Sequence, residues 1–163
     1  MVVKEIIRRN GDRYEVLIDD EDEALYDSYI WHVDPRRCTP YVLGRKRKSE
    51  DRRKKILHRV LLDPPRHLDV DHINNSGLDN RRCNLRACTR SENNMNCSSV
   101  TNGSSTYKGV YFAKHAKKWC ASVHINYKKM HIGYFVNEVD AAKAYNVAAK
   151  ELFGEFANLN IIE

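Results

Sequence analysis

Residues 69–96, DVDHINNSGLDNRRCNLRACTRSENNMN, combine many turn-forming residues with a carboxylate, an imidazole and several amides. Residues 70–73 can form a short strand that presents Asp71 and His72 on opposite sides, and the NNSG sequence at 74–77 then predicts a tight turn. Residues 85–87 predict a second strand, and a short helix is expected to open at Ser91. The stretch therefore predicts a β-β-α unit.

Four side chains of this unit suit hydrolysis of a phosphodiester bond. Asp71 and the amide oxygen of Asn93 are oxygen ligands of the kind that Mg²⁺ accepts beside water and phosphate. His72, whose unperturbed pKa is about 6.5, is available as a neutral base toward an attacking water. Asn84 is expected to fix the imidazole by hydrogen bonding and to hold the loop. Any one of these residues fits a plain turn as well, so the prediction rests on their combination.

The same stretch resembles the HNH (His-Me finger) endonucleases, in particular the homing endonucleases of phages and introns. The family pattern runs DH, then LDNRxxNLR, then TRSxNN, and the match extends upstream through ILHRVLL and the prolines at 64–65, so it covers residues 56–97. By position the resemblance implies these roles: Asp71 and Asn93 as metal ligands, His72 as general base, and Asn84 as the central asparagine of the motif.

One motif position departs from many family members, which carry His where this chain has Asn93. An amide oxygen there favours Mg²⁺ or Mn²⁺ over softer ions and makes zinc unlikely at the site. Asn94 stays open as the alternative ligand if the helix is shifted by one residue. His58 is expected to pack in the core or to support the site rather than to bind metal.

Charge is unevenly placed along the chain, whose formal net charge is +6 with a pI of about 9.1. Residues 12–27 are acidic, 45–55 (RKRKSEDRRKK) are strongly basic, and 101–131 contain six lysines and no acid. Such clustering favours a polyanionic partner such as nucleic acid, although a solvated basic surface would have the same composition. Two interpretations stay open for four arginines, namely contact with phosphates or ordinary surface charge. These residues are Arg81, Arg82, Arg86 and Arg90.

Composition excludes several classes of protein. The 163 residues, 42% hydrophobic and 31% charged, suit a globular chain of one domain or two small ones. Five cysteines without a CxxC pair argue against a secreted disulfide framework, and zinc binding by Cys83, Cys88 and Cys97 with a nearby His is disfavoured but open. Without a signal-like start or a long apolar run, we expect an intracellular protein, in the cytoplasm of a bacterial or phage-infected cell, with no membrane partner.

The N-terminal part is expected to be rich in strands. Asn10-Gly11-Asp12 predicts a hairpin turn, and 29–33 and 41–44 predict short strands. The acidic segment 21–29 predicts one or two helical turns. The basic residues 45–55 would form the turn before ILHRVLL, which passes from strand into a short helix ended by the two prolines.

After a Ser- and Gly-rich segment at 98–105, expected to be a linker, the pattern changes. Strands are predicted at 109–113, 119–125 and 129–135, followed by a helix that starts after Asn137 and ends near Phe153. This predicts a three-stranded antiparallel sheet with one face covered by the helix and the other exposed. The residues expected to line the covering side of the helix are Val139, Ala142, Tyr145, Ala148, Ala149 and Leu152.

Residues 106–160 resemble the APETALA/ethylene-response-factor (ERF) DNA-binding domain, on the pattern YRGV, a Trp-containing strand, xLGxF and AAxAYDxAAxxxFGxxAxLN. In that family the exposed sheet face lies in the DNA major groove. Several family arginines are replaced here, which implies weaker base discrimination and more phosphate binding. Trp119 could instead be sheet core. The implied DNA-facing set is Lys108, Tyr111, Lys114, Lys117, Trp119, Ser122, His124, Lys129 and His131.

The predicted class is therefore α+β: a ββα-metal nuclease domain with an N-terminal β-rich extension (1–97), a linker (98–105) and an ERF-type domain (106–163). The expected function is hydrolysis of double-stranded DNA, one strand per active site, by a monomer or weak dimer without a small-molecule substrate. The basic segment 45–55 would provide a second region of contact with the duplex. Two alternatives stay open, namely a non-enzymatic DNA-binding regulator on a nuclease-derived scaffold and an RNA-binding protein.

Overall fold

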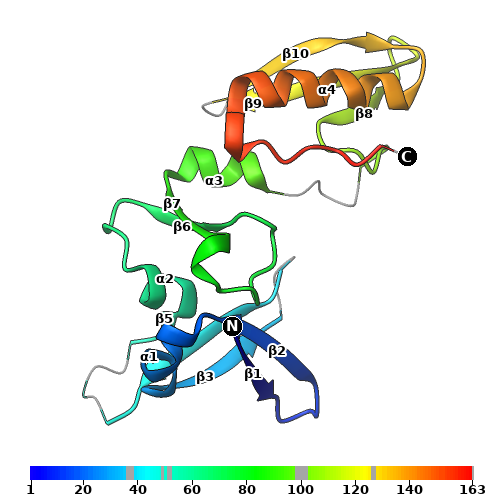
Figure 1. Cartoon of the computed structure of the whole chain (residues 1–163). Helices are drawn as coiled ribbons and strands as arrows, with labels where there is room; N and C mark the ends of the chain where they lie inside the picture. The colour runs from blue at the N-terminus through cyan, green and yellow to red at the C-terminus, as the bar shows by residue number, and fades with distance from the viewer. Residues whose placement is uncertain (36–38, 49, 51–52, 98–102, 126–127, 163) are drawn as a thin grey trace. The chain divides into compact units, whose positions relative to one another are not determined.

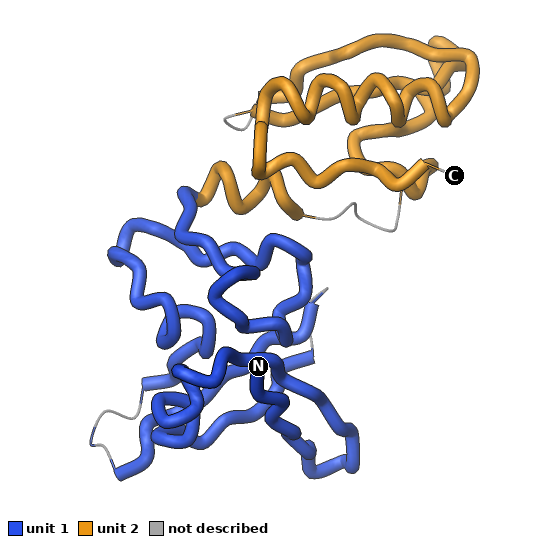
Figure 2. Tube along the Cα trace, viewed as in Figure 1, with its two compact units in different colours: residues 1–89 blue, residues 90–163 orange. Residues whose placement is uncertain are grey.

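The computed structural model describes the chain apart from residues 36–38, 49, 51–52, 98–102, 126–127 and 163. The described part is mixed α/β, with four α-helices and four small sheets (Figure 1). It divides into two compact units, Met1–Thr89 and Arg90–Glu163 (Figure 2). No helix among the described residues is both long and apolar enough to cross a membrane.

The first unit begins with the expected hairpin. Strands β1 (Val2–Ile7) and β2 (Arg13–Ile18) pair antiparallel, and Gly11 between them has a φ of +90°, which glycine tolerates without strain. Two short helical segments follow, a 3-10 turn at Asp20–Asp22 and α1 at Glu23–Asp27. The predicted hairpin and helical turns are confirmed.

A second sheet of the first unit has the order β3 (Tyr29–Asp34), β4 (Tyr41–Lys46) and β5 (Lys55–Ile56). The predicted turn at 45–55 lies partly outside the described residues, at 49 and 51–52. As expected, ILHRVLL passes from β5 into α2 (Leu57–Leu62), which ends at Asp63 in the left-handed region with φ +44°. The prolines at 64–65 then prevent the helix from continuing.

The quoted stretch begins with two paired strands. Strand β6 (Asp69–His72) runs antiparallel to β7 (Leu85–Cys88), with a 3-10 turn (Arg82–Asn84) before β7. Both strands contribute to the apolar core of the unit, where Val70 and Leu85 pack with residues from the earlier elements. The core members from those elements are Ile6, Val16, Ile18, Tyr26, Val33, Val42, Leu57 and Leu61.

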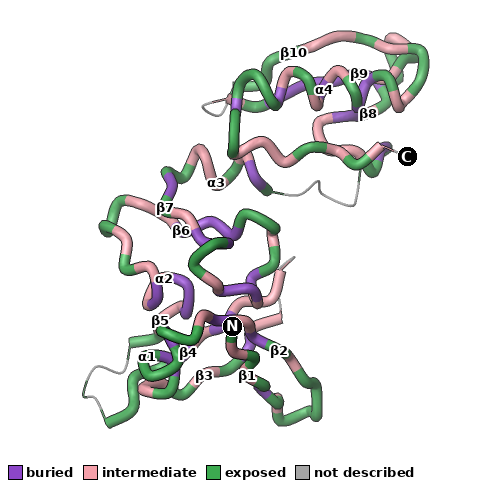
Figure 3. The backbone as a smooth tube through the Cα atoms, viewed as in Figure 1, coloured by how far each residue is buried: buried purple, intermediate pink, exposed green. Residues whose placement is uncertain are grey.

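The second unit contains the predicted sheet and helix. Strand β9 (Lys118–Ile125) lies between β8 (Val110–Ala113) and β10 (Lys128–Phe135), and all pairs are antiparallel. Helix α4 (Glu138–Phe153) begins where Asn137 accepts a 2.8 Å hydrogen bond from the Asp140 N–H and ends at Gly154. Buried positions recur every three or four residues along α4 (Figure 3), as expected for a helix with one side packed in the core.

The core between α4 and the sheet combines small residues with two large rings, those of Tyr145 and Phe153. Tyr145 and three alanines of α4 pack on Ala121 and Val123 of β9. Gly109 has a φ of +74°, and an added Cβ would lie 2.1 Å from the Tyr145 ring, so only glycine fits. The expectation for Leu152 was wrong, since it is 44% exposed, and Phe153 is buried in its place.

The boundary between the units falls before helix α3 (Arg90–Asn96) rather than after residue 97. The last carbonyls of α3 accept hydrogen bonds from elsewhere in the second unit: Met95 O from the Lys108 ammonium, and Asn96 O from Asn158 Nδ2 at 2.8 Å. Met95 also packs against the second core. Of the predicted linker, residues 98–102 lie outside the described residues.

Candidate active site

The loop between β6 and β7 is attached to the N-terminal hairpin. Leu17 of β2 donates its N–H to Leu78 O at 2.9 Å and accepts from the Asn80 N–H at 2.8 Å. On another side Thr39 Oγ1 donates to Asn75 O at 2.8 Å. The strand-rich N-terminal region therefore holds the loop that carries the site, which gives it a role beyond enlarging the core.

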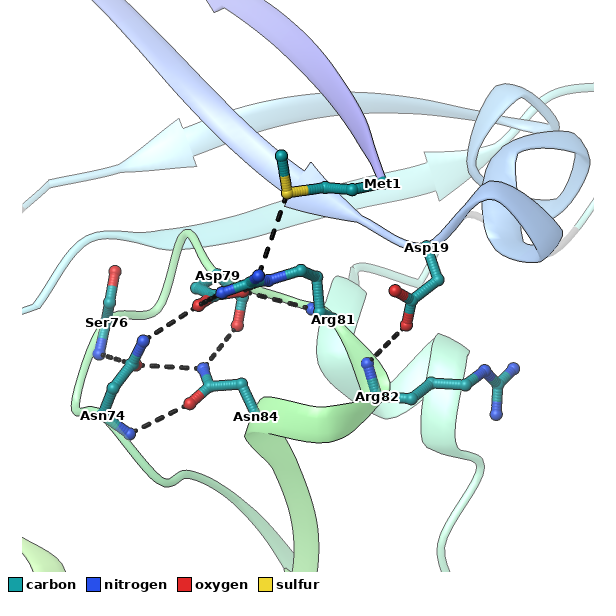
Figure 4. A network of polar contacts seen from close by, with 8 residues as sticks. All are labelled: Met1, Asp19, Asn74, Ser76, Asp79, Arg81, Arg82 and Asn84. Atoms are coloured by element: carbon teal, nitrogen blue, oxygen red, sulfur yellow. Dashed lines mark hydrogen bonds and ion pairs between the residues drawn. The ribbon is translucent and has the colours of Figure 1, made fainter.

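Asn84 stabilises this loop with its whole side chain (Figure 4). Its Nδ2 donates to Asn74 Oδ1 at 2.9 Å and to Asp79 O at 2.8 Å, and its Oδ1 accepts from the Asn74 N–H at 3.0 Å. Both amide hydrogens are thus used inside the loop. Consequently Asn84 has no hydrogen left to donate to His72, and the predicted contact with the imidazole is made instead by Asn80.

Two arginines of the motif are bound by carboxylates close to the loop (Figure 4). Arg81 Nε and Nη2 each lie 2.7 Å from an oxygen of buried Asp79, and these hydrogen bonds hold the pKa of Asp79 below its usual range. Arg82 Nη2 lies 2.7 Å from Asp22, and its backbone N–H donates to Asp19 at 2.7 Å. The acidic segment after β2 therefore neutralises part of the motif's own positive charge.

Asp71 lies at the buried end of β6, only 5% exposed, opposite Arg86 on β7. Arg86 donates from Nε at 2.9 Å and from Nη2 at 2.7 Å, both to Asp71 Oδ2. A buried carboxylate needs such a charged partner, because an unpaired charge in the interior is costly. The predicted phosphate contact of Arg86 thus competes with an ion pair to the predicted metal ligand.

His72 follows Asp71 directly and is 4% exposed. Its Nε2 is 3.4 Å from Asn80 Oδ1, and its ring lies 4.9 Å from the His58 ring and 5.8 Å from the Tyr41 ring, centroid to centroid. Burial lowers the pKa of His72 below 6.5, against smaller opposing effects of Asn80 and the carboxylates of Asp71 and Asp79. The ring is therefore neutral at neutral pH, as a general base must be.

His58 is the buried neighbour of His72 on α2. Its ring meets both His72 and Tyr41 at interplanar angles of 75°, edge to face. Its Nδ1 is buried without a hydrogen-bond partner in the described structure, and burial lowers the pKa of His58 to about 3. His58 therefore packs as a neutral ring, in line with the expectation that it lies in the core or supports the site.

Asn93 lies on α3 and so belongs to the second unit, whereas Asp71, His72 and Asn84 belong to the first. Asn93 is half-buried and Asn94 is exposed, which favours Asn93 as the residue with a fixed position. Arg90, at the start of α3, is exposed. Ligation by Asn93 stays a prediction.

The cysteines considered for zinc are dispersed. Cys83 and Cys97 are exposed, while Cys88 is buried. Across the described residues, no three His, Cys, Asp or Glu side chains cluster closely enough to hold a metal ion. Among these described residues, Asp71 with an asparagine amide matches the oxygen donor set that suits Mg²⁺ beside water or phosphate.

The face of the second sheet opposite α4 carries several of the residues predicted to contact DNA. The register places Tyr111 and His131 on the face opposite α4, and Lys129 Nζ lies 4.0 Å from the Tyr111 ring centroid. Ser122 is buried on the middle strand. Lys114, Lys117, His124, Lys129 and His131 are exposed.

Two members of the predicted DNA-facing set point elsewhere. Lys108 donates its ammonium to Met95 O, and burial lowers the pKa of Lys108 to about 8. Trp119 packs against the core and meets Phe112 edge to face, so it occupies the core position left open as its alternative. The basic character of the face thus depends on the lysines outside these two positions.

Sequence reasoning did not single out Asn80 and Asp79, although both stand in the quoted stretch. Asn80 is 1% exposed and contacts His72, while Asp79 binds Arg81 and Asn74. In a single sequence an asparagine beside an aspartate predicts a turn equally well. The roles of Asp79 and Asn80 become visible only in the folded chain, where Leu17 pairs with this loop from more than sixty positions away in the sequence.

Comparison with known proteins supports the family resemblance. The chain is 39% identical over 99 residues to a protein of Acanthamoeba polyphaga mimivirus described as an uncharacterized HNH endonuclease. The match covers 61% of this chain and 50% of the relative, so the chain spans about half the length of that protein. No family model and no solved structure matches the chain. The similarity supports an HNH endonuclease class and leaves the ERF-type resemblance as a prediction from sequence.

Proposed function

We propose that this chain is a metal-dependent DNA endonuclease of the HNH homing type. The observation that carries the proposal is the adjacent pair Asp71 and His72 at the end of β6, both buried and both held by partners from the same unit. Similarity to a protein described as an HNH endonuclease supports the same class. The substrate we propose is double-stranded DNA, cut in one strand at each active site.

His72 is the proposed general base. A neutral imidazole with a depressed pKa is ready to accept a proton from a water that attacks phosphorus, and such help is typically worth about 10²–10⁴-fold in rate. His58 and Tyr41 fix the plane of the ring from the side. Asn84 keeps the surrounding loop in one conformation through its three hydrogen bonds.

Asp71 is the proposed metal ligand, with Asn93 as the second. Bound Mg²⁺ or Mn²⁺ would stabilise negative charge on the phosphate and the leaving oxygen. Asp71 Oδ2 accepts two hydrogen bonds from Arg86. Asp71 can therefore bind a cation only if the carboxylate contacts the metal and the guanidinium together, or if the guanidinium moves away. Arg86 released in this way would be available to a phosphate, which would reconcile its two roles.

The exposed sheet of the second unit is proposed to hold the duplex. Lysines on β10 and in the turn after β8 supply sequence-independent phosphate contacts, and Lys129 is steadied above the Tyr111 ring. Lys cannot form the planar fork with which Arg reads guanine. We therefore expect affinity to depend strongly on salt and base discrimination to be modest.

A non-enzymatic DNA-binding regulator is the second candidate. The ion pair between Arg86 and Asp71 favours it, because a carboxylate satisfied by arginine can be a structural group instead of a ligand. Supercoiled plasmid incubated with protein in Mg²⁺, Mn²⁺ or EDTA decides between the two. The nuclease predicts metal-dependent nicking that His72→Ala lowers by at least about 10²-fold while DNA binding persists. Intact plasmid in every metal, with binding retained, would establish the regulator.

A further inference from the structure

Three exposed rings form an aromatic strip on the face of the second sheet opposite α4. Ala121 of β9 packs in the core with α4, so its neighbour Cys120 faces the other way, and Tyr134 of β10 lies directly opposite Cys120. Tyr134 is 44% exposed and was not among the residues predicted to contact DNA. The other two members are exposed imidazoles, His131 on the same strand and His115 in the turn between β8 and β9.

Neighbouring side chains hold the rings of the strip in place. His131 Nδ1 lies 3.2 Å from Cys120 Sγ, and the Tyr134 hydroxyl lies 3.1 Å from His115 Nε2. The rings of His131 and Tyr134 are 4.6 Å apart, centroid to centroid, at an interplanar angle of 51°. Because these rings are already ordered, they lose little conformational entropy when a ligand covers them.

The surroundings of the strip are basic. The sequence contains no acidic residue at 110–135. Lys129 Nζ lies 4.0 Å from the centroid of the Tyr111 ring on the same face, and exposed Lys117 stands in the same turn as His115. Lysines bind phosphates without regard to base sequence. The rings are therefore the part of this face that would meet a group other than a phosphate.

The ring of Tyr134 matches one group in the major groove of a duplex. Base edges there present hydrogen-bond donors and acceptors, and the 5-methyl group of thymine is the apolar group among them. Unpaired bases can stack on aromatic side chains, whereas paired bases are stacked on each other and expose only their edges. The Tyr134 hydroxyl is engaged by His115, so the ring offers mainly apolar surface.

We propose that Tyr134 is a specificity-determining residue whose ring packs against the 5-methyl group of thymine in duplex DNA, with His131 and His115 fixing the ring on either side. The proposal rests on the proposed function in one respect, namely that this sheet holds the duplex. Burial of one methyl group corresponds to about fourfold in affinity, so the preference for thymine is modest. The lysines alone would bind every sequence alike.

Two duplexes of the same mixed sequence, one with thymine and one with deoxyuridine at every T position, differ only in the 5-methyl groups. Fluorescence anisotropy of labelled duplex in EDTA, which prevents metal-dependent cleavage, measures the dissociation constant of the full chain for each. We expect the wild type to bind the deoxyuridine duplex at least about fourfold more weakly.

Variants of Tyr134 test which residue reads the methyl group. Tyr134→Ala should make the two dissociation constants nearly equal, because no ring is left to pack on the methyl. Tyr134→Phe keeps the apolar ring and should keep the wild-type ratio. Lys129→Ala is the matched control on the same face: loss of a phosphate contact should weaken binding to both duplexes by the same factor and leave their ratio unchanged.

Several outcomes would overturn the proposal. Equal affinity of the wild type for the two duplexes does so whether or not any variant folds. A merely structural role for Tyr134 would leave the ratio unchanged in Tyr134→Ala, and this result also refutes it. A protein that nicks plasmid without preferring thymine refutes the methyl contact alone. A protein that prefers thymine and leaves plasmid intact in every metal refutes the proposed nuclease and leaves the methyl contact standing.

Discussion

The two units of this protein are stabilised by different kinds of interior. Of the ten buried polar or charged residues in the described structure, seven lie in Met1–Thr89, including all three buried carboxylates. The second unit instead packs alanines, valines and the rings of Tyr145 and Phe153 between a helix and a sheet. Buried polar groups lower the free energy of unfolding unless they are hydrogen-bonded. The stability of the first unit therefore depends on its polar contacts more than that of the second.

The two units also differ in how their basic side chains are bound, which separates the proposed site of cleavage from the proposed DNA-binding surface. In the first unit the motif arginines Arg81, Arg82 and Arg86 are all bound to carboxylates. In the second the exposed lysines lie on or beside a sheet face. We therefore expect changes in the first unit to affect stability and cleavage, and changes on the second sheet face to affect DNA affinity alone.

Arg86→Met should have the largest effect on stability. It leaves the carboxylate of Asp71 buried without its guanidinium, and such a loss typically costs about 3–5 kcal/mol. Chemical denaturation of the metal-free protein measures the free energy of unfolding. Mg²⁺ should raise the unfolding temperature of this variant more than that of the wild type, because the cation replaces the lost positive charge.

The control is Arg13→Met, which breaks an exposed ion pair with Glu5 and should cost about 0–1 kcal/mol. Equal losses for the two variants would show that the Arg86–Asp71 pair is no more than a surface contact in solution.

Gly109→Ala should destabilise the second unit by about 2–4 kcal/mol, since it adds backbone strain and a clash with the Tyr145 ring and Ser122 O. The chain has two tryptophans, Trp31 and Trp119, one in each unit. In a Trp31→Phe background the fluorescence of Trp119 follows the second unit alone.

Gly154→Ala is the matched control for Gly109→Ala. Its φ is also positive, at +53°, but nothing lies within 4 Å of an added Cβ, so only the strain of about 1–2 kcal/mol should remain. A cost for Gly109→Ala no greater than this would refute the close packing on Tyr145.

The stability of the first unit should depend on pH through His58. The folded pKa of about 3 lies below the unfolded value of 6.5, so the unfolded chain binds more protons in between. Stability is therefore full above pH 6.5 and falls by about 1.4 kcal/mol per unit as the pH drops toward 3, and the lowered pKa of His72 adds a loss of the same sign. Denaturation at several pH values, followed by Trp31 in a Trp119→Phe background, measures the slope.

His58→Phe should lower the slope of stability against pH by the amount that corresponds to about one bound proton. The phenyl ring keeps the packing of His58 but cannot be protonated. His67→Phe, at an exposed position, serves as the control. A slope identical in wild type and His58→Phe would show that the His58 ring is solvated in the folded protein.

Lys129→Ala should have the smallest effect, confined to DNA binding. Loss of one phosphate contact lowers the slope of log affinity against log salt by about 0.9. Lys143→Ala, an exposed lysine on α4 and so on the other layer of the unit, should leave the slope unchanged. A wild-type slope near zero would contradict phosphate binding by the sheet altogether.

Most helices and strands can be predicted from the amino-acid sequence, because their signals are local. Asn10-Gly11-Asp12 marked the hairpin, Asn137 marked the start of α4, and three strand-like segments marked the second sheet. The sequence also placed Asp71 and His72 side by side, since adjacent residues at the end of a strand need no long-range information.

Tertiary structure alone decided how the polar residues divide their roles. Asn84 looked suited to hold the imidazole, but its amide is consumed within the loop, and Asn80 reaches His72 because β2 binds the loop backbone through Leu17. Likewise Lys108, which was predicted to face DNA, donates its ammonium to the carbonyl of Met95 on α3. These contacts depend on hydrogen bonds between segments far apart in the chain. The composition and spacing of residues within one segment therefore cannot predict them.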